Sequence, residues 1–331
     1  MTALGLIRRR LFGVSSAAAV FSSDGFSPMA WTKFNHVANT LVHGYHAALR
    51  DPRPARLTAE LATTPNELRG IAWEGAGMGL GALDSVDPSQ RWVMQYGNGA
   101  AKNHLYPFYI GVGMALARLR RPPERSLPQL DPVVGWVIAD GYGFHETFFR
   151  RQRHAPYVPV PDALTSYSQQ MFDQGVGRAL WFSLGADADL VNFHIRGFEP
   201  HRHEALWTGV ALAGSYCGGN REQLKKVTVH AAPFRTQLAV GSAIAAWGRA
   251  EAASPASHTQ TACEVFADTS FDEAARIASR ARDNVPSITG STSAMELWRL
   301  GIADAFGSTL SISQGPETKP EQTQDLVGSE L

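Results

Sequence analysis

Apolar residues recur at three- and four-residue spacing along most of the chain, which is the pattern of an amphipathic helix. In the stretch 31–50 these positions are Phe34, Val37, Leu41, Tyr45 and Ala48. Segments rich in proline or glycine separate such stretches, and no alternating apolar and polar run indicates a strand. The pattern predicts an all-α protein, with helices at about 31–50, 66–83, 101–120, 132–150, 166–183, 202–217, 230–250, 271–284 and 291–306.

Four short blocks of sequence occur twice in the same order. Trp73-Glu-Gly75 returns as Trp207-Thr-Gly209, and similar matches begin at Gly44 and Gly175, Gly113 and Gly241, and Val137 and Val265. Ordered matches of this kind indicate an internal duplication, here into two pseudo-equivalent halves of about 130 residues. We therefore expect an N-terminal arm or first helix over 1–30, helical repeats over 31–150 and 151–306, and a disordered acidic tail over 307–331.

Glycines are concentrated inside two of the predicted helices. Gly75, Gly77, Gly79 and Gly81 alternate in one stretch, and Gly111-Val-Gly113 opens another. Because glycine costs about 1 kcal/mol relative to alanine inside a helix, these positions need a physical reason. We expect close approach of neighbouring helix backbones; the alternative is that Gly75–Gly81 forms a loop near a ligand.

The composition excludes some classes of function. Thirty basic and 30 acidic residues give a net charge of zero, so the chain lacks the basic face of a nucleic-acid-binding protein. Near-zero charge favours association over solubility, which is compatible with a homo-oligomer or with protein partners. The two cysteines, Cys217 and Cys263, make no disulfide framework and fit a reduced cytoplasm.

The N-terminal segment allows two interpretations. Arg8-Arg-Arg10, followed by a short apolar stretch with two serines, loosely resembles a secretory or twin-arginine signal. The alternative is an arm or first helix of the domain, which we favour because the apolar stretch is short and interrupted. No uncharged apolar run of about 18 residues predicts a membrane-spanning helix.

The densest group of chemically active residues runs from Asp140 to Arg150. On a helix His145 shares a face with phenylalanines, and desolvation there would lower its proton affinity, as suits a general base. Asp140, His145 and Glu146 are therefore the candidate catalytic residues. The alternative is a core histidine and a surface pair between Glu146 and Arg150.

A second charged group lies in the apolar stretch Phe172–Phe182. Asp173 and Arg178 need partners if they are buried there, because an unpaired buried charge is costly. Arg178 could grip a substrate carboxylate or phosphate, or it could bond Asp140 or Glu146 in a structural clamp. We expect Asp140, His145, Glu146, Asp173 and Arg178 to converge on one polar cluster.

Two histidine groups have some character of metal sites, but neither completes a known ligand pattern. His43 and His46 stand three residues apart, and His201, His203 and Glu204 are close in sequence. The HExxH and paired ExxH patterns are absent, so no metal site is predicted. The chain also has no nucleophile elbow, and its cofactor stays unknown.

The segments Asp140–Glu146, Phe172–Phe182 and Leu206–Tyr216 resemble a bacterial family, domain of unknown function 1702. The resemblance covers roughly residues 1–305, and Phe172-Asp-Gln-Gly175 is its most specific part. It implies an association with actinobacterial enediyne gene clusters, in which the family is similar to UnbL-type accessory proteins encoded beside the polyketide synthase. The implied pathway, a branch of antibiotic biosynthesis, matures a polyene into an enediyne core. No catalytic residue is carried over.

Two classes of function remain open. The protein is either an enzyme, or enzyme subunit, that acts on an apolar polyene or polyketide intermediate, or a non-catalytic helical scaffold that holds it or docks other pathway proteins. Trp73 and Trp207, together with small residues at helix interfaces, could frame an apolar groove for either. Buried, converging polar residues would favour the enzyme, and a broad exposed apolar patch would favour the scaffold.

Overall fold

The structure, a computed structural model, describes residues 3–14, 28–150, 157–287 and 292–313. These residues form helices and no strand, which confirms the all-α prediction. The helices are α1 (Ala3–Phe12), α3 (Pro28–Arg50), α4 (Pro54–Ala62), α5 (Asn66–Val86), α6 (Trp92–Gly97), α7 (Leu105–Arg118), α8 (Val137–Phe148), α9 (Ser166–Ser183), α10 (Ala188–Ile195), α11 (His203–Tyr216), α12 (Arg221–His230), α13 (Arg235–Glu251), α14 (Ser257–Ala267), α15 (Phe271–Asp283) and α16 (Ala294–Ser313).

Each helix predicted from apolar spacing is present, with boundaries shifted by a few residues. The pattern did not predict the shorter helices α4, α6, α10, α12 and α14. The last helix continues to Ser313, past the boundary expected at residue 306. Residues 15–27 of the expected N-terminal arm and the acidic segment Glu317–Leu331 lie outside the described residues.

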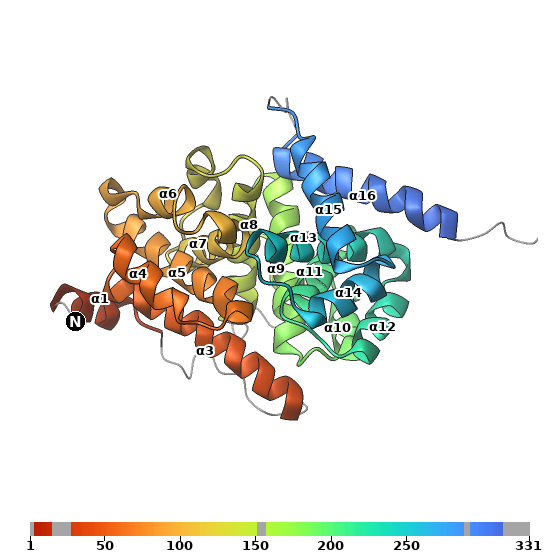
Figure 1. The fold of residues 1–331 in the computed structure, drawn as a ribbon, viewed down its shortest axis with the longest axis horizontal. Coiled ribbons are helices and arrows are strands. Elements are labelled where there is room, and N and C mark those ends of the chain that lie inside the picture. Colours follow the sequence, from red (N-terminus) through yellow and green to blue (C-terminus); the bar gives the residue numbers. More distant parts are fainter. Residues whose placement is uncertain (1–2, 15–27, 151–156, 288–291, 314–331) are drawn as a thin grey trace, which may run out of the picture.

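Seven long helices pack against one another in chain order, from α3 through α5, α7, α8, α9 and α11 to α13. We call them the helix stack (Figure 1). Other helices cover its ends: α1 packs on α3, while α14, α15 and α16 pack on α13. Within the described parts of the chain, no helix has the length and the apolar character needed to cross a membrane.

Paired glycines set the distance between neighbouring helices of the stack. At the α8–α9 crossing, a Cβ built on Gly143 would lie 2.0 Å from the carbonyl oxygen of Phe172, and one on Gly175 would lie 1.9 Å from that of Asp140. No side chain fits there, so the two backbones touch. The close-approach prediction is confirmed, because the same reciprocal contact recurs at Gly44 and Gly75, Gly77 and Gly111, Gly113 and Gly141, and Gly177 and Gly209.

Candidate functional site

The glycine crossings bring polar side chains together inside the stack. Glu74, Asp140 and Gln174 each immediately precede a crossing glycine, on α5, α8 and α9 respectively. Their backbone carbonyls are the ones that the glycines of the next helices contact. Since adjacent helices cross closely at these positions, the side chains extend into the same interior region. Arg178, one turn after Gln174 on α9, joins them.

Arg178 is the centre of this polar cluster. Its NH1 group donates to Asp140 Oδ1 at 2.5 Å, and its NH2 group lies 3.4 Å from Glu74 Oε1. Gln174 Nε2 donates to Asp140 Oδ2 at 2.7 Å and to the Tyr106 hydroxyl at 3.0 Å. The cluster is buried, with Asp140 and Gln174 fully inaccessible to solvent. We call these five residues the Arg178 cluster.

The cluster contains two carboxyl groups for one guanidinium. Burial raises the pKa of Glu74 to about 7, with Arg178 opposing the rise and Asp140 adding to it. Burial also raises the pKa of Asp140, against the pull of Arg178. Although burial opposes its charge, the two carboxylates raise the pKa of Arg178. Glu74 is therefore the member that exchanges a proton near neutral pH.

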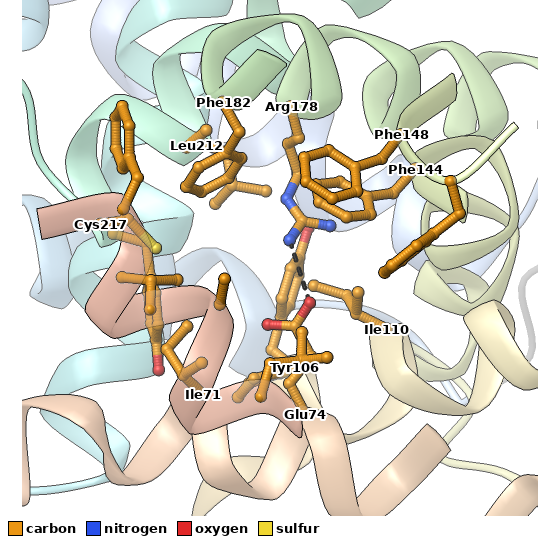
Figure 2. Close-up of a pocket in the computed structure, with 18 residues that line it drawn as sticks. Ile71, Glu74, Tyr106, Ile110, Phe144, Phe148, Arg178, Phe182, Leu212 and Cys217 are labelled. Atoms are coloured by element: carbon orange, nitrogen blue, oxygen red, sulfur yellow. Dashed lines mark hydrogen bonds and ion pairs between the residues drawn. The ribbon is translucent and has the colours of Figure 1, made fainter. Parts of the chain in front are cut away.

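A narrow apolar pocket, which we call the slot, opens onto Glu74 and Arg178 (Figure 2). Its cavity volume is about 60 Å³. Figure 2 shows the guanidinium and the Glu74 carboxylate pointing toward each other across it. The other lining residues are Phe34, Val37, Ala38, Leu41, Ile71, Tyr106, Pro107, Ile110, Phe144, Phe148, Phe149, Phe182, Leu212, Ala213, Tyr216 and Cys217.

Aromatic rings form one side of the slot and cover Arg178. The guanidinium carbon lies 5.0 Å from the centroid of the Phe144 ring, a favourable cation–π distance. Phe144 in turn stacks on Phe148 at 5.2 Å and meets Phe182 edge-on at 5.9 Å. Phe34 of α3 closes the row against Phe182. The charged group is thus held among rings that exclude water from it.

Asp173 does not join the Arg178 cluster. It accepts hydrogen bonds from two nitrogens of Arg202, from Nε at 3.0 Å and from Nη2 at 2.6 Å. Arg202 also donates to the carbonyl oxygen of Val158, stacks on Phe198, and lies 3.5 Å from the exposed carboxylate of Glu199. Neither Asp173 nor Arg202 is among the described residues that line the slot. Asp173 therefore belongs to a separate group of ion pairs around Arg202.

His145 and Glu146 also lie apart from the cluster. His145 Nδ1 is 3.5 Å from Glu146 Oε1, and the His145 ring lies 5.3 Å from that of Phe149. Burial lowers the pKa of His145, opposed by Glu146, as expected for an imidazole among phenyl rings. Glu146 pairs with Arg150 at 3.0 Å. Among the described residues, the slot lining includes Phe149 but not His145.

Both tryptophans of the predicted groove are core residues. Trp73 packs against Tyr96, His104 and Phe108, and Trp207 is almost fully buried. Neither is among the described residues that line the slot, whose aromatic wall consists of phenylalanines and tyrosines.

Three members of the Arg178 cluster were not predicted from the sequence: Glu74, Gln174 and Tyr106. A signal for Glu74 was present: it is the one charged residue in the buried run from Gly70 to Leu83, and a buried charge requires a partner. Gln174 and Tyr106 had no such signal, because a neutral polar residue next to apolar ones is common.

The described residues contain no group of three or more His, Cys, Asp or Glu side chains that could hold a metal ion. His43 instead lies 3.8 Å from Glu60, and His203 bonds the carbonyl oxygen of Phe198.

Comparison with known proteins gave one result. No curated protein and no solved structure matches the chain. The model of a protein family of unknown function, DUF1702, matches residues 3–306. That range includes the whole helix stack, the Arg178 cluster and the slot, and it agrees with the resemblance found in the sequence. The chain therefore belongs to the DUF1702 family.

Proposed function

We propose that the protein is a cytoplasmic accessory protein of bacterial enediyne biosynthesis that holds or acts on an apolar polyene intermediate in the slot. The slot carries the proposal. Apart from Glu74 and Arg178, aliphatic, aromatic and cysteine side chains line it. A narrow apolar pocket with a few converging polar groups suits an extended hydrocarbon chain with limited polar substitution.

Binding of linear molecules of increasing length tests the slot directly. Each methylene removed from water contributes about 0.8 kcal/mol, which corresponds to about a fourfold fall in Kd. We expect linear alcohols to displace a fluorescent conjugated tetraene with affinities that rise by about this factor per carbon and then level off. An affinity that does not depend on chain length would contradict the proposal.

A variant that fills the slot locates the binding. Ala38 lines the slot from α3, so Ala38→Phe should weaken tetraene binding by about tenfold or more through steric exclusion. Asn39→Phe is the matched control, because Asn39 is the exposed neighbour on the same helix and does not line the slot. Equal affinities for the two variants would place the ligand elsewhere.

A gene deletion tests the pathway. We expect the deletion strain to accumulate a polyene or polyketide species that mass spectrometry detects. Complementation by wild-type protein and by His145→Ala should clear it, whereas Arg178→Ala should not. Accumulation of an unchanged intermediate in the Glu74→Gln strain, with slot binding intact, would identify an enzyme rather than a carrier.

The alternative function, a scaffold that docks other pathway proteins, is supported by a different observation. Leu190 and Phe193 on α10 and Val229 on the neighbouring α12 are exposed, Phe193 by 71% and Val229 by 74%. If docking at this face is the function, Phe193→Ser with Val229→Ser should abolish complementation and leave slot binding unchanged.

We also propose that the chain arose by duplication of a unit of about 130 residues. The recurrence of Trp73-Glu-Gly75 as Trp207-Thr-Gly209 supports it, since both glycines contact the backbone of the preceding stack helix. Superposition of the halves in an experimental structure should place Trp73 and Trp207 in equivalent packing. Unrelated surroundings for the two rings would contradict the duplication.

A further inference from the structure

A second, polar crevice borders the slot at the end formed by α3 and α11. The two share the wall residues Val37, Ile71, Tyr216 and Cys217. The crevice has a volume of about 180 Å³, and its remaining lining residues are Lys33, His36, Glu67, Leu68, Arg249 and His258. Its lining therefore differs from that of the slot in having several ionisable groups.

Arg249 in this crevice is a buried cation without a carboxylate. It is 2% exposed and donates to the carbonyl oxygens of Tyr216 at 2.5 Å and Ser254 at 3.1 Å. Its Nε has no hydrogen-bond partner, and no carboxylate of the described residues lies within ion-pair distance of it. A buried guanidinium normally pairs with an anion, whereas the nitrogens of Arg249 are held by neutral carbonyl oxygens, including that of Glu67.

Lys33 adds a second cation to the lining of the crevice. It is half-buried, with Nζ beside Gly218 and the His258 ring, and no carboxylate of the described chain pairs with it. The carboxylate of Glu67 is engaged with His258 Nδ1 at 3.2 Å and is more than half exposed. Burial, aided by Lys33 and Arg249, lowers the pKa of His258 to about 4, so this ring is neutral near pH 7. The crevice thus has an excess of positive charge.

We propose that the crevice binds the carboxylate of a long-chain polyene acid whose hydrocarbon tail lies in the slot. This inference rests on the proposed function and adds the head group and the orientation of the ligand. The Arg178 cluster contains two carboxyl groups for one guanidinium, so an anionic head is disfavoured beside it. Lys33 and Arg249, with no anion of their own, provide the complementary charge. The head therefore lies at the crevice, and the apolar chain extends past the shared wall toward Phe144.

The test compares one hydrocarbon chain with different head groups. The probes are a conjugated C18 tetraenoic acid and the corresponding tetraenyl alcohol, with Kd measured from probe fluorescence on the full chain. We expect wild-type protein to bind the acid about tenfold more tightly than the alcohol, as for a hydrogen-bonded charge pair. Lys33→Met should weaken acid binding alone and bring the two Kd values within about threefold.

Lys225→Met is the matched control, because Lys225 is exposed on α12 and outside both cavities. Thermal melting confirms that each variant is folded. Equal binding of acid and alcohol by wild-type protein, or an unchanged preference in Lys33→Met, would overturn the head-group site and leave the slot proposal standing. Tighter binding of the tetraenyl phosphate would also overturn it, in favour of a phosphate head. Failure of all probes to bind would refute the slot as well.

Discussion

Two buried arginines, Arg178 and Arg202, bind carboxylates in different surroundings. Arg202 contacts Asp173 through two nitrogens and lies 3.5 Å from the carboxylate of Glu199, whose side chain is 66% exposed. Arg178 divides its contacts between Asp140 and Glu74, which are both buried. The second carboxylate is therefore solvated at Arg202 and desolvated at Arg178, where burial raises the pKa of Glu74 to about 7.

The two sites also differ in access. Glu74 and Arg178 line the slot, whereas the Arg202 pair lies outside it. An enclosed ion pair whose second carboxylate is solvated mainly fixes packing. Two buried carboxyl groups that share one guanidinium on the wall of a cavity can exchange a proton or a hydrogen bond with a ligand. Access to a cavity and burial of the second carboxyl group thus separate a candidate site from a structural pair.

The largest expected effect comes from removing Arg178, which sits between two buried carboxyl groups. Arg178→Met leaves Asp140 and Glu74 buried together, and we expect it to lower the free energy of unfolding by about 5 kcal/mol at pH 8. The loss should shrink toward pH 5, because the pKa of Glu74 is about 7 and burial also raises the pKa of Asp140, so the charge left behind decreases as the pH falls. Urea unfolding at the two pH values measures it, with the exposed Arg280→Met as control. A loss below about 1 kcal/mol would mean that the cluster does not hold the stack together.

Removing Arg202 should affect stability without affecting ligand binding. We expect Arg202→Met to destabilise by about 3–4 kcal/mol, since Asp173 is then buried alone. Tetraene binding by the folded fraction should be unchanged. Adding Asp173→Leu should restore most of the loss, because an apolar pair of similar volume replaces the ion pair. Weakened tetraene binding in the double variant would remove the distinction between the two sites.

The sequence allows the long helices to be predicted but not most of the short ones. Stretches such as 66–83 and 166–183 have enough apolar positions to establish a helical period. In α12 only Leu224 and Val227 are buried, and two apolar positions are too few to establish a helical period. The close-packed glycines were also predictable, because glycine is costly in a helix unless backbones touch.

The site was predictable only in part, because the sequence does not show which side of each helix faces which neighbour. Arg178 and Asp140 are charges inside apolar stretches, and each needed a partner, so their pairing followed from desolvation. The sequence did not predict that Asp173 and its neighbour Gln174 bond to different partners. The helix crossings decide which neighbouring helix each side of α9 faces. His145 was favoured for its aromatic surroundings, but the turn of α8 places Phe148 and Phe149, rather than His145, among the residues that line the slot.

A smaller effect on the free energy of unfolding comes from the protonation of Glu74. Its pKa rises from 4.5 to about 7 on folding, so the fold favours the protonated carboxyl. The stability that results is full below pH 4.5 and is lost as the pH rises through 7. The change corresponds to about 3 kcal/mol. We expect wild-type protein to lose about this much more than Glu74→Gln between pH 4.5 and 8, measured by urea unfolding. Parallel pH profiles would show that Glu74 is ionised throughout.

The smallest expected effect is at His145. Its Nδ1 has only the 3.5 Å contact with Glu146 Oε1, and burial lowers the pKa of the ring, so the imidazole occupies its place in the core mainly in its neutral form. Replacing such a group with an apolar ring of similar shape is nearly neutral. We expect His145→Phe to change the free energy of unfolding by less than about 1 kcal/mol, and to leave both tetraene affinity and complementation as in wild type. Normal stability with lost complementation would instead assign a chemical role to His145, and the distinction between an accessible site at Arg178 and enclosed residues elsewhere would then fail.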